Sequence, residues 1–158
     1  MSKKIDLVLI SVNSPLKCGI YQDLYLRKEF FSIQKTSDGL LEIFSEIFSY
    51  LQDQNLDLDS IFYARGPGSF TSLKLTHIFL QTLTLSLGVK LYSSDSFYFN
   101  QNAPISAFGN KFFIREDSGG IKLKELKIKK NDNFFLPEKI DLSAFDSQNA
   151  PLYILPPI

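Results

Sequence analysis

Cysteine and histidine are almost missing from this chain of 158 residues, since each occurs once, as Cys18 and His77. A single cysteine excludes an intramolecular disulfide and is typical of a protein from a reducing compartment. His77 has no cysteine, histidine or acidic companion at the spacing that a zinc or iron site needs. We therefore predict no metal site and a cytoplasmic location.

The chain also lacks net charge, because seventeen Lys and Arg residues balance seventeen Asp and Glu residues. The overall field of a neutral molecule does not attract nucleic acid, so contact with RNA would have to be indirect or through a local patch. Long apolar runs are missing too. Asp6 and Asn13 interrupt the first one, and we expect neither a signal peptide nor a membrane span.

Phenylalanine, by contrast, is abundant, with fifteen Phe, seven Tyr and no Trp. Large apolar residues are most often buried, so a core filled with Phe is the first interpretation. The alternative is that some of these side chains serve an interface with another protein.

The apolar segments predict an α/β fold in the order β-β-β-α-β-α-β. Strands are expected at 5–12, 18–22, 24–33, 60–64 and 90–93, and helices at about 38–55 and 72–87. Asp38 is expected to cap the first helix, which Asn55 ends, and Gly88 is expected to end the second. Hairpins followed by helical crossovers imply a mixed sheet whose later strands are parallel.

The composition changes near residue 95, so we predict an N-terminal α/β domain over 1–95 and a small, mostly β second part over 96–158. Gly109-Asn110 and Gly119-Gly120 are expected at turns between strands. Further strands are predicted at 126–130 and 152–155, the last of them ended by Pro156-Pro157.

A glycine-rich loop, residues 65–74 with the sequence RGPGSFTSLK, joins a predicted strand to the second helix. Two glycines around a proline permit a tight, rigid turn, and Ser69 and Thr71 can cap the helix that follows. Such a loop can hold an anion at the helix N-terminus or present a fixed surface to another protein. The residues leave both uses open.

The second predicted helix has apolar residues over about two thirds of its circumference, whereas packing on one sheet needs only a third to a half. Its polar stripe holds Lys74, His77, Gln81 and Thr84. The surplus apolar surface must face either the first helix or a partner protein.

Candidates for catalysis are few. The sequence around Ser69 is not Gly-x-Ser-x-Gly and has no evident base, so a serine hydrolase is rejected. Cys18 is predicted to be an inert buried thiol. Residues 11–14 offer no acid to hold Mg²⁺, which argues against ATP chemistry. The lysines at 122, 124, 127, 129 and 130 are interpreted as a solvated strand face, with RNA contact as the alternative.

The glycine loop and the order of elements together resemble the TsaB (YeaZ) family, half-size members of the actin/Hsp70/sugar-kinase superfamily with an actin-like ATPase (ribonuclease H-like) fold. The family motif is Arg-Gly-Pro-Gly-Ser-Phe-Thr-Gly-Leu-Arg. Ser72 and Lys74 depart from it, and the matching residues are Arg65, Gly66, Pro67, Gly68, Ser69, Phe70, Thr71 and Leu73. The chain also departs from the family at 11–13, where Asp-Thr-Ser is usual, and in its shortened second part.

The resemblance implies a cytoplasmic, non-catalytic scaffold for threonylcarbamoyl-adenosine modification of tRNA, with no catalytic or metal-binding residue. It would dimerise with the catalytic paralogue TsaD, be joined by the ATPase TsaE and reach tRNA indirectly. It would form a homodimer when isolated. ATP or ADP could bind only at an interface shared with partners. The alternatives are a small phosphotransferase of the same fold, or a degenerate member kept as an interaction module.

The resemblance also suggests site residues. The glycine loop is expected near a nucleotide or at a partner-docking site, through Gly66, Pro67, Gly68, Ser69, Phe70, Thr71 and Lys74. The partner interface is predicted to contain Leu40, Phe44, Ile47 and Phe48 on the first helix, and Leu75 and Phe79 on the second.

Overall fold

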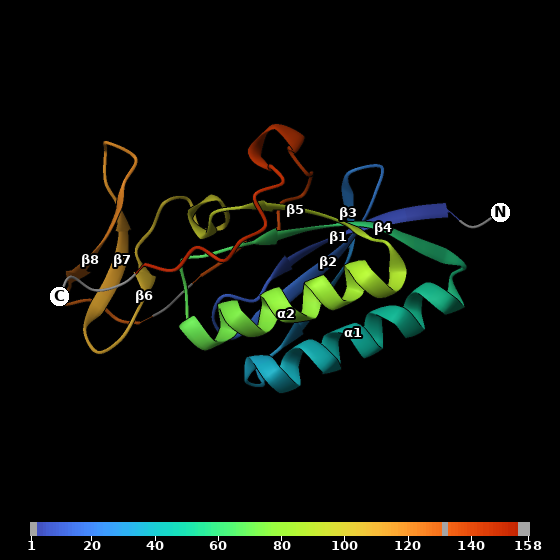
Figure 1. Cartoon of the computed structure of the whole chain (residues 1–158), viewed down its shortest axis with the longest axis horizontal. Helices are drawn as coiled ribbons and strands as arrows, with labels where there is room; N and C mark the ends of the chain where they lie inside the picture. The colour runs from blue at the N-terminus through green and yellow to red at the C-terminus, as the bar shows by residue number, and fades with distance from the viewer. Residues whose placement is uncertain (1–2, 131–132, 155–158) are drawn as a thin grey trace.

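A five-stranded mixed sheet with two helices on one face forms the larger part of the molecule (Figure 1). The computed structural model describes residues 3–130 and 133–154. The first seven elements are β1 (Lys3–Ile10), β2 (Leu16–Gln22), β3 (Tyr25–Ser32), α1 (Thr36–Asp53), β4 (Leu56–Ala64), α2 (Phe70–Leu87) and β5 (Lys90–Ser94). The predicted order and the mixed sheet are both confirmed.

The strands lie in the order β3-β2-β1-β4-β5. β1, β2 and β3 pair antiparallel, whereas β4 pairs parallel with both β1 and β5. The turn between β2 and β3 uses Asp23 and Leu24 at positive φ angles of 52° and 72°, which is the conformation that a tight two-residue hairpin turn requires. β1 is the central strand, and its residues from Leu7 to Ile10 are buried on both faces of the sheet.

Alternation along β1 divides the core into two layers. Leu7 and Leu9 face the helices and pack with Ile43 and Ile47 of α1. Val8 and Ile10 face the opposite side of the sheet, where an aromatic cluster that includes Phe97 covers them. Eight of the fifteen Phe residues are buried, so the prediction of a Phe-filled core is confirmed for these: Phe30, Phe44, Phe62, Phe97, Phe99, Phe112, Phe113 and Phe134.

A second, three-stranded antiparallel sheet lies at the end of the molecule opposite the N-terminus (Figure 1). It follows the 3-10 helix η1 (Ser96–Phe99) and contains β6 (Ile105–Ser106), β7 (Lys111–Arg115) and β8 (Ile121–Glu125). The turns at Gly109-Asn110 and Gly119-Gly120 join these strands, as expected. Residues 126–130 and 152–154 form no strand, so those two predictions are wrong. Residue 155 and Pro156-Pro157 lie outside the described residues.

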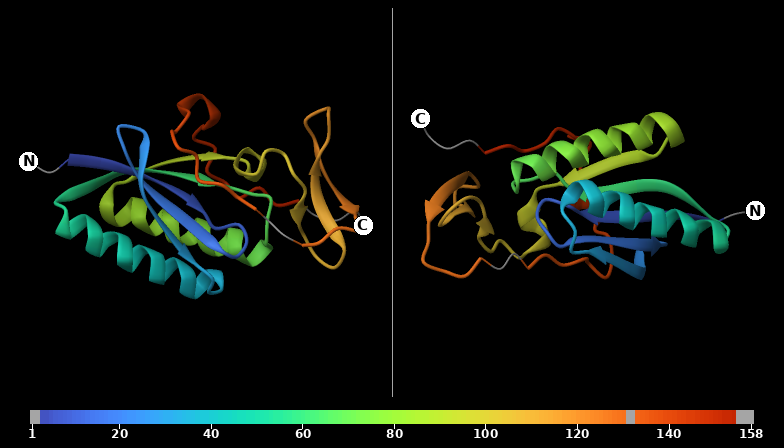
Figure 2. Two further views of the ribbon diagram at one scale, coloured as in Figure 1. Left: turned by 180° about the vertical axis from the view of Figure 1, so that it is seen from behind. Right: turned by 90° about the horizontal axis from the view of Figure 1, so that it is seen from below.

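Residues 133–154, which we call the C-terminal strap, cross the face of the sheet away from the helices and reach both of its edges (Figure 2). At the β3 edge, the Leu26 N–H donates to Glu138 O at 2.9 Å. At the β5 edge, Ser93 and Asp146 exchange two backbone hydrogen bonds of 2.8 and 3.0 Å. The short 3-10 helix η2 (Leu142–Ala144) lies between these contacts. The strap therefore protects both sheet edges without forming a strand of its own.

The helix ends correct one prediction. α1 begins at Thr36 after Lys35, which makes no side-chain cap bond, so Asp38 is not the cap. Asp38 instead lies in the first turn, where a carboxylate favours the helix dipole. Ser69 caps α2 and Gly88 ends it in a left-handed conformation, as expected. None of the described helices combines the length and the hydropathy that a membrane crossing needs.

Candidate functional site

The glycine loop packs so closely that two of its positions exclude a side chain. A Cβ on Gly68 would lie 2.6 Å from Val12 Cβ and 2.7 Å from Val12 O, two residues beyond the end of β1. Gly66 has φ +127°, and a Cβ there would lie 2.5 Å from Leu152 O of the strap. Glycine at both positions therefore lets the loop fit between β1 and the strap.

Ser69 joins the loop to β1 and to α2. Its N–H donates to Val12 O at 2.8 Å and to Asn13 Oδ1 at 2.9 Å. Its hydroxyl accepts from the Ser72 N–H at 3.4 Å. The predicted rigid turn and the Ser69 cap are thus present, and both the backbone and the hydroxyl of Ser69 serve a structural role.

The strap covers another side of the loop. The Leu152 N–H donates to Arg65 O at 2.8 Å, and the rings of Phe70 and Tyr153 stack at 4.4 Å. The Arg65 guanidinium donates to Ser93 O and to Asp146 Oδ1, each at 3.1 Å. The Arg65 side chain is therefore directed toward β5 and the strap. It does not point toward a ligand in the glycine loop, where it could have paired with an anion.

A cavity of about 310 Å³ lies where the first turns of α1 and α2 meet. The hydroxyls of Thr36 and Ser72, 2.5 Å apart, join the two helices there. The lining residues are Asn13, Ser14, Lys35, Thr36, Ser37, Ser69, Thr71, Ser72 and Leu75. This polar hollow contains Ser69 and Thr71 of the predicted loop site, whereas Lys74 lies exposed outside it.

Three of the six predicted partner contacts lie inside the protomer. The exposed fractions of Leu40, Phe44 and Ile47 are 2%, 2% and 0%, because these side chains point from α1 onto the sheet. They have no surface to offer a partner, so their assignment to the interface is corrected. Phe48, Leu75 and Phe79 are half-buried, and Phe79 of α2 reaches α1, since the Phe44 and Phe79 ring centres lie 4.7 Å apart.

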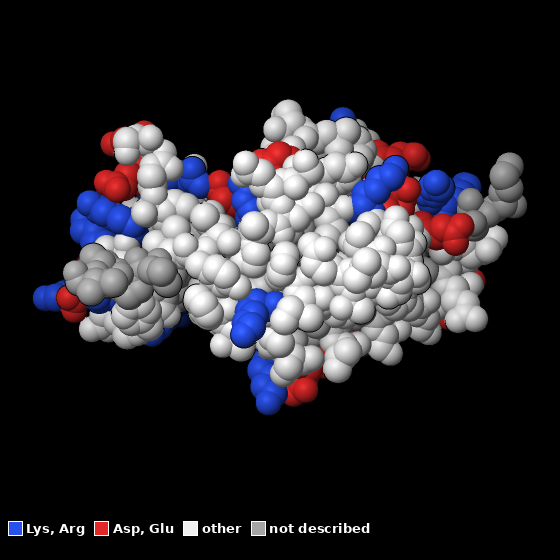
Figure 3. Space-filling view, in the orientation of Figure 1, with Lys and Arg blue, Asp and Glu red and all other residues white. Residues whose placement is uncertain are grey.

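The outward surface of the two helices presents other apolar residues, which sequence reasoning missed. Leu41, Ile78 and Leu85 have exposed fractions of 66%, 54% and 88%. We call these residues, together with Phe48, Leu75 and Phe79, the helix face. Figure 3 shows that the surface around α2 carries almost no Lys, Arg, Asp or Glu. A helical projection could have identified Ile78 and Leu85, since both lie opposite the buried Leu80.

The groups considered for catalysis do not converge. Cys18 is fully buried, and this burial raises the pKa of its thiol. His77 lies half-buried on α2. Among residues 3–130 and 133–154, no three His, Cys, Asp or Glu side chains gather as a metal-binding group.

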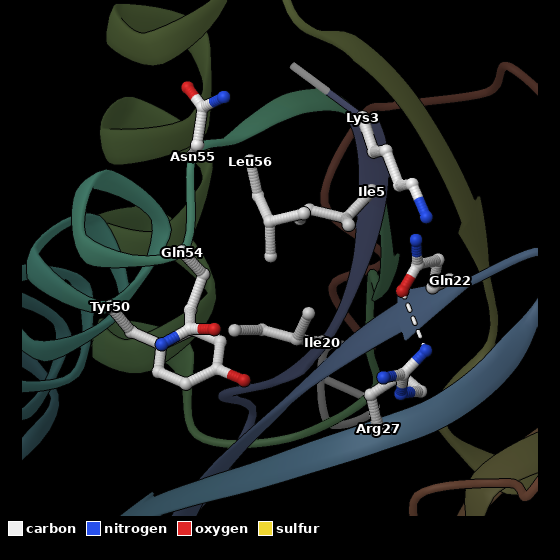
Figure 4. Close-up of a pocket in the computed structure, with 9 residues that line it drawn as sticks. All are labelled: Lys3, Ile5, Ile20, Gln22, Arg27, Tyr50, Gln54, Asn55 and Leu56. Atoms are coloured by element: carbon white, nitrogen blue, oxygen red, sulfur yellow. Dashed lines mark hydrogen bonds between the residues drawn. The ribbon is translucent and has the colours of Figure 1, made fainter. Parts of the chain in front are cut away.

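A cavity of about 330 Å³ lies at the far end of the sheet, away from the glycine loop. Figure 4 shows Lys3, Gln22 and Arg27 on one side of it and Tyr50 and Gln54 on the other. Arg27 donates to Gln22 Oε1 at 2.6 Å, so part of the polar lining is satisfied internally. Neither the sequence motif nor the helix face extends to this cavity.

A third cavity, of about 620 Å³, lies on the strap side of the sheet and contains Asp6 and Asp59 beside Phe62 and Tyr92. Partial burial, and secondarily the charge of Asp59, raise the pKa of Asp6 to about 6. Asp59 itself lies 3.7 Å from the Lys4 ammonium.

Comparison with known proteins gives a sequence relative and a larger set of similar structures, two of which are described here. The tRNA threonylcarbamoyladenosine biosynthesis protein TsaB of Buchnera aphidicola is 27% identical over 90 residues, which cover 54% of this chain and 41% of that protein. YeaZ from Pseudomonas aeruginosa superimposes with a TM-score of 0.55 and 18% identity over 78% of this chain and 64% of that one. A second structure, described as similar to peptidase YeaZ from Pseudomonas aeruginosa, has a TM-score of 0.55, 16% identity and the same coverage. No family model matches the chain.

The mixed sheet, the two helices on one of its faces and the glycine loop between β4 and α2 define an α/β protein of the actin-like fold. The aligned region spans less than half the length of the TsaB relative. The sequence match and the shared fold together support membership of this chain in the TsaB/YeaZ family.

Proposed function

We propose that this protein acts in threonylcarbamoyl-adenosine modification of tRNA in the cytoplasm, as a non-catalytic scaffold. The kinship with a TsaB protein supports the pathway. The observation that supports a scaffold is the helix face, where Leu41 of α1 and Ile78 and Leu85 of α2 expose apolar surface, with few charged residues around α2. Such a patch is costly for a monomer and is typical of a surface that another protein covers.

The partner that we propose for this surface is a TsaD-like paralogue with an equivalent pair of helices. Two helix pairs can pack ridge into groove, so that Ile78 and Leu85 enter the partner's grooves while Phe48, Leu75 and Phe79 line the seam. Burial of about 800 Å² on each partner would suffice for a stable complex. In the absence of the paralogue, the same surface would form a homodimer.

The experiment is co-purification of this chain with the TsaD-like protein of the same organism. Ile78→Asp and Leu85→Asp place a charge on the helix face at positions that the isolated chain exposes, so they leave the core intact. We expect either variant to weaken the complex at least tenfold, since a buried unpaired charge costs several kcal/mol. Leu142→Asp, an exposed apolar position in η2 on the strap side, is the matched control and should bind normally.

Binding by Ile78→Asp that equals binding by Leu142→Asp would exclude the helix face as the docking surface. Depletion of the protein followed by measurement of threonylcarbamoyl-adenosine in bulk tRNA tests the pathway separately. A fall in the modified nucleoside supports the proposal. An unchanged level would show that the chain is an interaction module outside tRNA modification.

The glycine loop gives this scaffold its geometry. Ser69 fixes the start of α2 against the end of β1, so the direction of the helix that carries Ile78 and Leu85 depends on this turn. We propose that a TsaE-like ATPase docks near the cavity at the first turns of α1 and α2. Lys35, which lines that cavity, would supply positive charge toward a nucleotide shared with the partner.

A further inference from the structure

The three-stranded sheet holds a local excess of positive charge in a chain that is neutral overall. Residues 108–130 contain seven of the seventeen basic residues and only three of the seventeen acidic ones. The remaining residues then contain ten basic and fourteen acidic side chains. We call residues 108–130 the basic segment, and its charge separates this end of the molecule from the rest.

Side chains alternate between the two faces of β8, and its lysines lie on the exposed face. Ile121 and Leu123 are half-buried against the aromatic cluster, whereas Lys122 and Lys124 are exposed. Lys122 lies 3.4 Å from Glu116, and both side chains remain largely open to solvent. Two residues along a strand span about 6.6 Å, so these ammonium groups form a row that can follow the phosphates of an extended polyanion.

Protection of a sheet edge explains only part of this row. β8 is an edge strand, and lysine on an edge prevents pairing with other chains. The positive charge continues after the strand ends, however, in Lys127, Lys129 and Lys130, which are all exposed. Since these residues form no strand, edge protection gives no reason for their charge.

An exposed aromatic ring adjoins the lysines. Phe108, in the turn between β6 and β7, is 50% exposed, and the Lys111 ammonium lies 5.3 Å from the centre of its ring. The Leu126 N–H donates to Asn110 O at 3.0 Å, which places the start of the 126–130 stretch beside this turn. The sequence did not reveal this platform, because Phe108 is separated from Lys127 by nineteen positions and two strands.

We propose that the basic segment is a contact surface for single-stranded or looped RNA, with Lys122, Lys124 and the lysines at 127–130 on the phosphates and Phe108 stacking on a base. A groove of positive charge with an aromatic platform is the combination that binds single-stranded nucleic acid. An acidic protein surface would use the same lysines but would gain nothing from the ring. The choice of tRNA as the natural partner rests on the proposed function. In this proposal the basic segment contacts the tRNA directly.

The test measures binding of the full-length chain to a fluorescent anticodon stem-loop RNA over a range of salt concentrations. We expect Lys122→Ala/Lys124→Ala to reduce the slope of log K against log salt by about 1.4, since each single-strand phosphate contact contributes about 0.7. Phe108→Ala should weaken binding about fivefold or more without a change in slope, because only stacking is lost. Lys3→Ala/Lys4→Ala removes the same charge from the other end of the molecule and should leave the slope unchanged.

Three results would overturn the assignment: no measurable RNA binding, an equal loss of slope in the Lys3/Lys4 control, or equally tight binding to polyglutamate that Phe108→Ala does not affect. The last would identify an acidic protein surface as the partner. Thermal melts verify that each variant folds. Because binding is measured on the isolated chain, it is independent of the depletion assay. RNA binding with unchanged modification would refute the proposed function alone, and reduced modification without RNA binding would refute this surface alone.

Discussion

Substitution of Gly68 by alanine tests the close approach that positions the glycine loop. The new Cβ would lie 2.6 Å from Val12 Cβ, whereas carbon atoms pack comfortably at about 3.5–4.0 Å. Val12 cannot yield, because it is 1% exposed and belongs to the cluster on the strap side. The loop must therefore move by roughly 1 Å away from β1.

This movement has two costs. The hydrogen bond from the Ser69 N–H to Val12 O, now 2.8 Å, would be lost or stretched, at about 1 kcal/mol. Strain from overpacking adds about 1–3 kcal/mol. We expect Gly68→Ala to lower the free energy of unfolding by about 2–4 kcal/mol and the Tm by about 5–15 °C for a protein of this size.

The assay is urea unfolding followed by tyrosine fluorescence and far-ultraviolet circular dichroism, since the chain has no Trp. Gly120→Ala is the matched control. A Cβ there would have its nearest neighbour at 3.8 Å, so the change should stay within about 0.5 kcal/mol. If Gly68→Ala and Gly120→Ala unfold at the same urea concentration, the close approach to Val12 does not constrain the loop.

Two further predictions concern the two faces of the sheet. Burial, with Asp59 second, raises the pKa of Asp6 from 3.8 to about 6. Between these values the folded state binds more protons than the unfolded state, so stability falls as pH rises from about 4 to 6 and stays lower at neutral pH. Because Asp6 is only partly buried, solvent screening reduces the effect. In urea unfolding we expect Asp6→Asn to stabilise the protein by about 1 kcal/mol at pH 7 and by little at pH 3.5. Equal changes in stability at the two pH values would contradict this. On the helix side, Phe44→Ala should lower the free energy of unfolding by about 3–5 kcal/mol in the same assay. Ile78→Asp should change it by no more than about 0.5 kcal/mol. Similar losses for the two variants would show that Phe44 is not a core residue.

The first 95 residues follow local rules, and for this reason their sequence predicts their fold. Apolar periodicity locates the strands and helices, and Gly88 and Asn55 lie one and two residues beyond the last residues of α2 and α1. The missed cap of α1 lies at a point where the helix meets a distant part of the chain. α1 starts at Thr36 without a side-chain cap, and the Thr36 hydroxyl instead bonds to the Ser72 hydroxyl of α2, a contact that no pattern within the first helix contains.

The strap could not be predicted, because its contacts obey no period. Gly19 accommodates Leu136, since a Cβ there would lie 3.3 Å from the Leu136 side chain. Lys17 donates to Phe134 O at 2.7 Å, across 117 positions of sequence. Such contacts depend on the finished sheet, whose faces and edges exist only after strands distant in sequence have paired.

The partner interface shows the same division between local pattern and tertiary geometry. The spacing on α1 correctly identified an apolar stripe, but that stripe packs on the sheet, where Leu40, Phe44 and Ile47 are buried. α2 is apolar around most of its circumference, but only the sector with Leu73, Thr76 and Leu80 is fully buried. The remaining sector, with Ile78 and Leu85, stays exposed. The sequence of one helix can therefore show that it has more apolar surface than the sheet buries. Which of its apolar residues remain exposed depends on where the neighbouring helix packs.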